Sequence, residues 1–265
     1  MRFCSIASGS SGNCIYVGSD NTHVLIDTGI AGKNIEAGLN ALDLTSSDID
    51  AVLVTHEHSD HIGGLGVFSR KSGADIFVTE GTNKGMFLKG KLGDMSKSNI
   101  NIVKGGCDYE IGDLTIHVTS VSHDTMEPCA YTVSCNGKSA GVITDLGTYD
   151  DKIVRAYSDL DVLLIESNHD ERMLRAGWYP YHLQNRILSD KGHLSNTAGG
   201  RLLDAVLSEK IKHVFLGHLS KDNNYPELAR QTVITEVDGG PGKLSSRDFP
   251  MEIAMRDQIS RCIEF

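Results

Sequence analysis

The stretch that decides the fold is Thr55-His56-Glu57-His58-Ser59-Asp60-His61. It directly follows Ala51 to Val54, an apolar run that predicts a strand. Residues two apart on a strand point to the same side, so we expect His56 and His58 to share one side of the loop. The loop should turn Asp60 and His61 towards a neighbouring point. The stretch therefore predicts two adjacent metal sites.

The residue types of this stretch predict the chemistry of those sites. Imidazole suits zinc, iron or manganese, and carboxylates neutralise charge and can bridge two ions, which favours a dinuclear hydrolytic centre over a structural zinc site. The alternative, a solvated polar loop, requires three of the eleven histidines to fall within six residues by accident. We expect two divalent ions per chain, Zn²⁺ or Mn²⁺, and a hydroxide formed from the water that they share. Asp60 is placed to orient that hydroxide.

The pattern H-x-H-x-D-H after a strand resembles the signature of the metallo-β-lactamase superfamily, and further motifs match that family in order over nearly the whole chain. Taken alone, each of His123, Asp145 and His218 would more simply be a core or surface residue. Because they occur in the order of the family's ligands, the resemblance favours metal binding for all three. The resemblance implies these metal ligands: His56, His58, Asp60, His61, His123, Asp145 and His218.

The same resemblance implies how the ligands are divided. One ion is held by His56, His58, His123 and Asp145, and the other by Asp60, His61, Asp145 and His218. It also implies that Asp27 orients the metal loop without binding a metal.

The rest of the chain predicts a mixed α/β fold. Short β-rich runs at regular spacing dominate the first half and favour antiparallel sheet. The segments Gly32 to Leu42, Gly66 to Ser72 and Asn196 to Ser208 predict helices. No long linker divides the chain, so we expect residues 1–265 to form a single domain, a four-layer αββα sandwich of two mostly antiparallel sheets with helices outside.

Two further motifs bear on the reaction. Glu166 follows a predicted strand, and His193 precedes a predicted helix. In phosphodiesterase branches of the resembled family, an acidic residue and a histidine at such positions meet near the scissile phosphate. Glu166 would hold the tautomer of His193, which could contact phosphate or protonate the leaving oxygen. The alternative is ordinary helix capping, by Ser195 or Asn196, beside a surface histidine.

The segment Ser5 to Cys14, rich in serine and glycine, together with the motifs around Asp27, Glu166 and His193, most resembles the small YycJ/WalJ branch of this superfamily. That branch is associated with 5′-to-3′ exonuclease activity on DNA. The chain lacks room for the large β-CASP insertion, and no clear tRNA-binding arm protrudes. The resemblance implies a phosphodiesterase acting on nucleic acid, with DNA favoured over RNA and DNA repair as a candidate role.

Two rival functions stay open at this point. The first is hydrolysis of a small ester, thioester or lactam, which would leave Glu166 and His193 without a task. The second is a non-catalytic metal-binding protein that keeps the fold without turnover, against which the intact ligand set argues.

The net charge of −10 excludes a generally basic surface for nucleic acid, so phosphate must be attracted by the metals and by local patches. One segment interleaves cations and aromatic rings just ahead of His193: Arg172, Arg175, Trp178, Tyr179, Tyr181, His182, Arg186 and Lys191. Such a mixture predicts a track for single-stranded nucleic acid, and helix packing of the aromatic residues is an equal alternative.

The remaining features of the sequence concern its location. No run approaches the roughly 20 apolar residues that cross a bilayer, and no leader-like pattern opens the sequence, so we expect a cytoplasmic protein without membrane contact. The six cysteines form no C-x-x-C pair, which predicts reduced thiols. The oligomeric state is left open.

Overall fold

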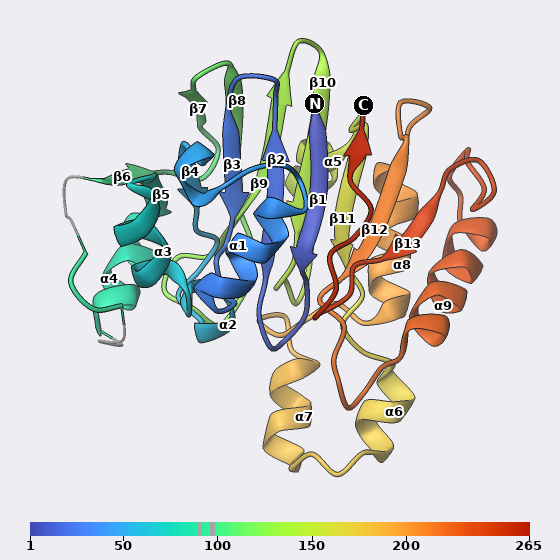
Figure 1. Cartoon of the computed structure of the whole chain (residues 1–265). Coiled ribbons are helices and arrows are strands. Elements are labelled where there is room, and N and C mark those ends of the chain that lie inside the picture. Colours follow the sequence, from blue (N-terminus) through green and yellow to red (C-terminus); the bar gives the residue numbers. More distant parts are fainter. Residues whose placement is uncertain (89–91, 96–98) are drawn as a thin grey trace. The chain divides into compact units, whose positions relative to one another are not determined.

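A computed structural model describes residues 1–88, 92–95 and 99–265 (Figure 1). The strands form two seven-stranded sheets. The chain divides into two compact units, each built from separate stretches of sequence. The first unit contains Met1–Ser120, Thr125–Lys138 and Met255–Phe265, and the second contains Val121–Asp124 and Ser139–Ala254. The expectation of a single domain stays a prediction.

The first unit contains a sheet of mixed direction in the order β14-β1-β2-β3-β4-β5-β6. The strands from β14 to β3 run antiparallel, and those from β3 to β6 run parallel. The bounds are β1 (Arg2–Ala7), β2 (Cys14–Gly18), β3 (His23–Ile26), β4 (Ala51–Leu53), β5 (Asp75–Thr79), β6 (Ile100–Val103) and β14 (Ile263–Glu264).

Helices account for the parallel part of this sheet, because parallel neighbours need a crossover connection. The elements that follow β3, β4 and β5 in the chain are α1 (Gly32–Asn40), the 3₁₀ turn η1 (Ser46–Asp48), α2 (Ser59–Ile62), α3 (Leu65–Ser72) and α4 (Glu80–Leu88). Two of the predicted helices are thereby confirmed, although α1 ends two residues earlier than predicted. The strands of this sheet therefore run in mixed directions, whereas the sequence predicts mostly antiparallel pairing.

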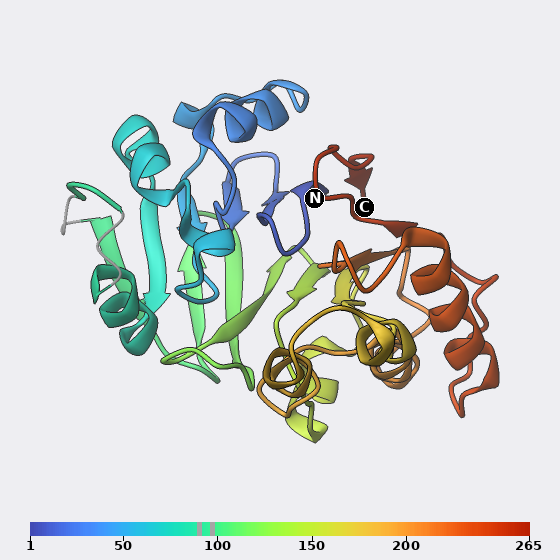
Figure 2. The same ribbon diagram turned by 90° about the horizontal axis from the view of Figure 1, so that it is seen from below.

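The core of the first unit lies between this sheet and its helices. Ile35 and Leu39 are one helical turn apart on α1, and Leu65 and Phe68 lie on α3, so each helix turns one apolar stripe inward. All four side chains are buried. Figures 1 and 2 show both helices on the same face of the sheet. Burial of each such side chain contributes about 1.5–3 kcal/mol.

The first unit also contains an antiparallel ladder of β7 (Asp108–Ile111), β8 (Leu114–Ser120) and β9 (Cys129–Cys135). Strand β9 fixes the start of the loop that follows β4. The backbone N–H of Cys129 donates to the carbonyl of Thr55 at 3.0 Å, and the hydroxyl of Tyr131 donates to the carbonyl of Val54 at 2.9 Å. The histidine-rich stretch therefore leaves the sheet from a buried, hydrogen-bonded anchor.

In the second unit, parallel strands follow in the order β10-β11-β12-β13. Their apolar runs are largely buried, as in sheets covered on both faces. The bounds are β10 (Lys138–Ile143, whose first residue belongs to the first unit), β11 (Val162–Glu166), β12 (His213–Gly217), β13 (Met251–Ile253), α5 (Asp151–Tyr157), α6 (Glu171–Ala176), α7 (Tyr181–Ile187), α8 (Asn196–Val206) and α9 (Pro226–Gly239).

The carboxyl ends of these parallel strands meet at one edge, where polar residues follow β10, β11 and β12. Helices α6 and α7 continue from that edge and face the viewer in Figure 2. The predicted helix beginning at Asn196 is confirmed as α8, and Ser195 caps it by accepting a hydrogen bond from the backbone N–H of Ala198. Among the described residues, no helix is long and apolar enough to cross a membrane.

Candidate metal centre

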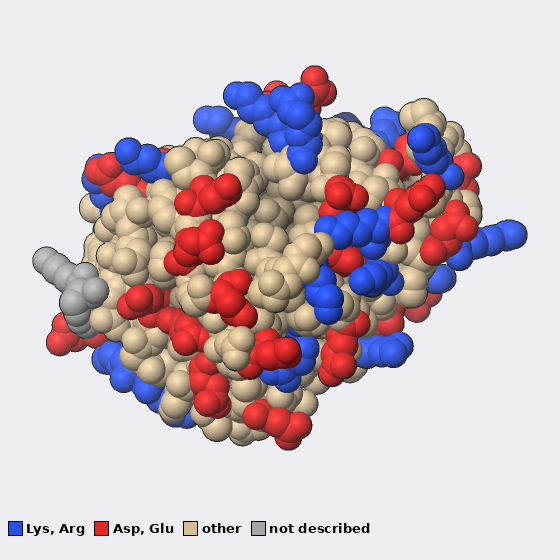
Figure 3. All heavy atoms as spheres, turned by 90° about the horizontal axis from the view of Figure 1, so that it is seen from above, with Lys and Arg blue, Asp and Glu red and all other residues tan. Residues whose placement is uncertain are grey.

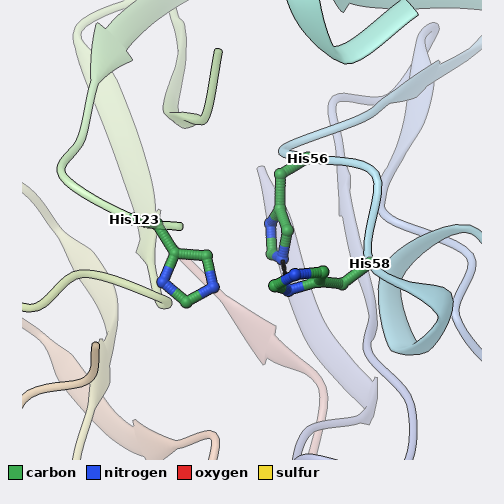
Figure 4. A group of neighbouring side chains, drawn as sticks. All are labelled: His56, His58 and His123. Atoms are coloured by element: carbon green, nitrogen blue, oxygen red, sulfur yellow. Dashed lines mark hydrogen bonds between the residues drawn. The ribbon is translucent and has the colours of Figure 1, made fainter. Parts of the chain in front are cut away.

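In the first unit, the stretch Thr55 to His61, called the metal loop below, brings its three histidine rings together. Nε2 of His56 lies 3.1 Å from Nδ1 of His58, the contact dashed in Figure 4. The ring centroids of His56 and His61 are 4.0 Å apart. Asp60 and His61 lie on the short helix α2, which begins directly after His58. Two ring nitrogens at this separation can both act as ligands of one cation, so the donor set fits the predicted chemistry.

Asp27 holds the ring of His61 in one orientation. Its Oδ2 lies 2.7 Å from Nδ1 of His61 and accepts a hydrogen bond from the Thr55 hydroxyl at 2.8 Å, while its Oδ1 accepts one from the Thr55 backbone N–H at 2.9 Å. A carboxylate accepts, so Nδ1 carries the proton and Nε2 is left as the ligand nitrogen. The orienting role that the family resemblance implies for Asp27 is therefore matched by its contacts.

Asp27→Asn is expected to lower metal affinity by about 10- to 100-fold, the usual effect of removing a group that orients a ligand. The new amide cannot accept hydrogen bonds through both of its terminal atoms, so His61 loses its fixed tautomer. Asparagine tolerates the backbone φ of 60° at this position, which isolates the electrostatic change. Competition with a chelator measures the affinity. Asp43→Asn, exposed and at φ 59°, is the matched control, and an unchanged affinity in Asp27→Asn would contradict the assignment.

Asn13 is a further contact of this loop, and sequence reasoning missed its role. Its side-chain nitrogen lies 3.1 Å from Nε2 of His61, and its backbone N–H donates to the carbonyl of Asp60 at 2.8 Å. The amide donates to Nε2, which agrees with a proton on Nδ1, and a metal bound at Nε2 would have to replace this hydrogen bond because that nitrogen has one lone pair. Asn13 lies far from the metal loop in sequence, and the pairing of β2 with β3 and of β3 with β4 brings the two together.

In the second unit, Glu166 lies fully buried at the centre of a hydrogen-bond network. Its Oε1 is 2.9 Å from Nδ1 of His193 and 3.0 Å from Nδ1 of His218. Its Oε2 accepts from the backbone N–H groups of Leu146 and Leu194, each at 3.1 Å. Burial would raise the pKa of Glu166, but the charge and hydrogen bond of His193 and the hydrogen bond of His218 lower it below its ordinary value. The predicted pairing of Glu166 with His193 is confirmed, and their catalytic role stays a prediction.

Asp145 is surrounded by imidazoles in the same unit. Its Oδ1 lies 3.5 Å from Nε2 of His218, 3.5 Å from Nδ1 of His193 and 3.8 Å from Nε2 of His123. Potential ligand atoms of Asp145, Glu166, His193 and His218 all lie within 4.8 Å of one another. A buried carboxylate among several imidazoles is a donor set that fits a divalent cation.

His123, also drawn in Figure 4, is prepared as a ligand by its own contacts. Its Nδ1 lies 3.0 Å from the carbonyl oxygen of Gly192, which accepts, so the proton is on Nδ1 and the lone pair that a metal binds is on Nε2. Burial lowers the pKa of His123, which favours the neutral ring that metals bind. The motif around His193 thus positions a second histidine through its glycine.

Three residues of the site adopt the left-handed backbone conformation that L-residues seldom occupy. Asp27, Asp145 and His218 have φ values of 60°, 59° and 57°, and each follows the end of a strand. Such conformations cluster where the surrounding structure holds a functional side chain in place. The three turns therefore aim these side chains from the ends of β3, β10 and β12.

Two asparagines that sequence reasoning assigned no role support His218. The side-chain nitrogen of Asn168 donates to the carbonyl of His218 at 2.9 Å. The side-chain nitrogen of Asn224 donates to the carbonyls of Ser167 and Asn168 at 2.9 and 3.0 Å. The only signal for Asn168 was its position two residues after Glu166, and Asn224 offered none.

The aromatic segment before His193 lies on α6, α7 and the residues that join them. Trp178 and Tyr181 are each 77% exposed, and α7 has no buried residue. The helix-packing alternative is therefore wrong for these two rings. Tyr179 is half-buried, and its hydroxyl donates to Asp222 at 2.9 Å. Exposed rings at this position are available to a partner.

Comparisons with known proteins agree with these features. Residues 22–219 match a family model described as a beta-lactamase superfamily domain. The chain is 40% identical over 237 residues to exodeoxyribonuclease WalJ of Streptococcus pneumoniae, covering 89% of this chain and 88% of that one. It is 39% identical over 233 residues to exodeoxyribonuclease YycJ of Bacillus anthracis, covering 88% of each. The crystal structure of Zn²⁺-bound PqqB from Methylobacterium extorquens superposes with a TM-score of 0.74 at 15% identity, covering all of both chains, which supports the fold alone.

Proposed function

This chain belongs to the metallo-β-lactamase superfamily of metal-dependent hydrolases, and on that premise we propose that it is an exonuclease acting on DNA. The observation that carries the proposal is the buried Glu166 holding His193 beside Asp145. Hydrolysis of a small ester or lactam would leave this pair without a task. Two relatives of similar length bear the name exodeoxyribonuclease, which supports the same reaction here.

The proposal assigns seven ligands to two divalent ions, Zn²⁺ or Mn²⁺. His56, His58, Asp60 and His61 come from the first unit, and His123, Asp145 and His218 come from the second. When bound, the ions supply an activated water and neutralise charge on the phosphate. What supports this assignment is that Nδ1 of His61 and Nδ1 of His123 each face an acceptor, which fixes the tautomer that carries its lone pair on Nε2.

The remaining roles fall to side chains of the chain itself. We assign Asp60 to accept a hydrogen bond from the attacking water and so orient it. His193 has its Nδ1 held by Glu166, and its Nε2 would donate a proton to the leaving oxygen. The ionised Glu166 stabilises the protonated ring, because opposite charges at hydrogen-bond distance attract strongly in a buried site.

The surface bears on the kind of DNA that is bound. The net charge is −10, and Figure 3, drawn from the side opposite to the view of Figure 2, shows acidic and basic side chains interspersed. Local features must then attract the substrate. Exposed rings stack on unpaired bases, and exposed arginines meet phosphates, so Trp178, Tyr181 and the neighbouring Arg172 and Arg175 support a single-stranded substrate.

The test is hydrolysis of end-labelled single- and double-stranded DNA and RNA by protein loaded with Mn²⁺ or Zn²⁺, with His193→Ala alongside. Stepwise release of nucleotides from one end of DNA, slowed in His193→Ala, is the expected result. If no polymer is cut with either metal while a thioester or lactam is hydrolysed, the exonuclease proposal fails and the small-molecule alternative replaces it.

Replacing both Trp178 and Tyr181 with alanine is expected to raise the KM for single-stranded DNA about tenfold or more, because each stacked base contributes about 1–3 kcal/mol. The kcat should change less, since neither ring lies in the Glu166 network. Steady-state kinetics on a labelled oligonucleotide measure both constants. Phe87→Ala, at a 43% exposed ring on α4, is the control, and an unchanged KM in the double variant would show that the rings do not bind substrate.

A further inference from the structure

The first unit contains an open cavity beside the metal loop, and the exonuclease proposal gives it no role so far. Its volume is about 490 Å³. The lining residues that matter here are Gly29, Ile30, Asn34, Ala37, Arg256 and Ile259. They come from the turn after β3, from α1 and from the stretch before β14.

The wall of this cavity is joined directly to the metal loop. A Cβ atom on Gly29 would lie only 1.6 Å from the carbonyl oxygen of Asp60, so no side chain can separate the two segments there. The backbone N–H of Thr28 donates to the carbonyl of His61 at 2.9 Å. A molecule in the cavity therefore lies next to the segment that carries two of the proposed ligands.

The chemistry of the wall combines apolar surface with a few polar groups. Ile30, Ala37 and Ile259 offer apolar atoms, and Ile259 is 39% exposed although it is a large hydrophobic residue. Arg256 brings a guanidinium, and Asn34 brings an amide that can both donate and accept. Sites for small organic ligands are typically of this composition and measure about 300–1,000 Å³.

One nucleotide matches these properties. Its base is a flat ring system suited to apolar walls, its edge needs donors and acceptors, and its phosphate suits a guanidinium. Asp257, which also lines the cavity, could accept from a base amino group and would repel a free anion, so a base-bearing ligand fits better than inorganic phosphate. The cavity is too small for a longer stretch of polymer.

We propose that this cavity receives the 5′-terminal nucleotide of the DNA strand that is cut, with Arg256 contacting its 5′-phosphate and Ile30 and Ile259 contacting its base. This inference rests on the proposed function and adds a binding subsite to it. It explains how an enzyme with this site would act from an end, because the cavity has room for one nucleotide and the guanidinium of Arg256 would meet the terminal phosphate.

Two variants test the subsite through the KM for a single-stranded oligonucleotide with a 5′-phosphate or a 5′-hydroxyl. Arg256→Gln should raise the KM of the phosphorylated substrate about tenfold and bring it near that of the hydroxyl form, the loss expected for one charge-assisted hydrogen bond. Ala37→Phe, at an exposed position of α1, should fill the cavity and raise the KM of both substrates. The control is Arg261→Gln, an exposed arginine of the same segment that does not line the cavity, which should keep the wild-type constants.

Thermal melting of each variant separates a binding effect from a folding defect. If Arg256→Gln and Ala37→Phe melt as the wild type does and keep its KM for both substrates, the subsite is refuted while the exonuclease proposal stands. If the wild type releases no nucleotides from any DNA end, the proposed function fails first, and the subsite is refuted with it.

Discussion

Replacing Asp60 with alanine is expected to lower the rate of DNA hydrolysis by at least about a thousandfold, a loss of roughly 4 kcal/mol of transition-state stabilisation. Two functions are removed together. Asp60 is a proposed ligand whose Oδ2 lies 3.6 Å from Nε2 of His61, and it is the proposed acceptor that orients the attacking water. Single-turnover hydrolysis of a labelled oligonucleotide measures the rate, and metal analysis of the same sample gives the number of bound ions.

Metal content decides between the two functions of Asp60. Loss of one ion with the activity would assign Asp60 chiefly as a ligand, and loss of activity with both ions retained would assign it chiefly to the water. Near-normal turnover with both ions bound would refute both roles. Asp20→Ala, an exposed aspartate in a turn of the same unit, is the control for a general effect of lost charge.

Glu166→Ala is expected to reduce the free energy of unfolding by about 3–5 kcal/mol, the cost of breaking a buried ionic network by removing one partner. Two imidazole nitrogens and two backbone N–H groups lose their common acceptor. Urea unfolding of protein treated with chelator measures the change without any contribution from bound metal. Activity should fall as well, because His193 is no longer held in one tautomer.

Glu166→Gln sharpens this test. The amide keeps the size of the carboxylate but replaces one acceptor with a donor, which faces either two ring nitrogens or two N–H groups. We expect a loss of stability smaller than that of Glu166→Ala but still measurable. Glu209→Ala, an exposed glutamate of the same unit, should unfold as the wild type does. Equal stability of all four proteins would mean that the buried network contributes nothing.

The sequence predicts the metal loop well because all of its residues lie within one short stretch of the chain. The spacing of His56 and His58 just after an apolar run predicts that their rings share one side, and the observed contact of 3.1 Å agrees although β4 itself ends at Leu53. The pairing of Glu166 with His193 is a longer-range prediction, and the family resemblance supplied it. It is confirmed because strand ends and helix starts meet at one edge of a parallel sheet.

The remaining features depend on tertiary contacts that no local pattern encodes. Strand direction was expected to be mostly antiparallel, since regular spacing of short strands does not reveal which connections are crossovers. Asn13 reaches His61 only through strand pairing, and Asn224 reaches Asn168 only through the loop before α9. The sequence does not predict the exposure of Trp178, because an aromatic ring beside cationic residues is equally typical of helix packing and of a binding surface.

The left-handed turns at Asp27, Asp145 and His218 have a consequence for how this chain can change over generations. Each such conformation costs about 1–3 kcal/mol, and glycine would adopt it without strain. A glycine at any of these positions would relax the backbone while deleting a carboxylate or imidazole that the site uses. At Asp27 the same change would also remove the acceptor of the Thr55 and His61 hydrogen bonds, so the strain of the turn and the contacts of the site are inherited together.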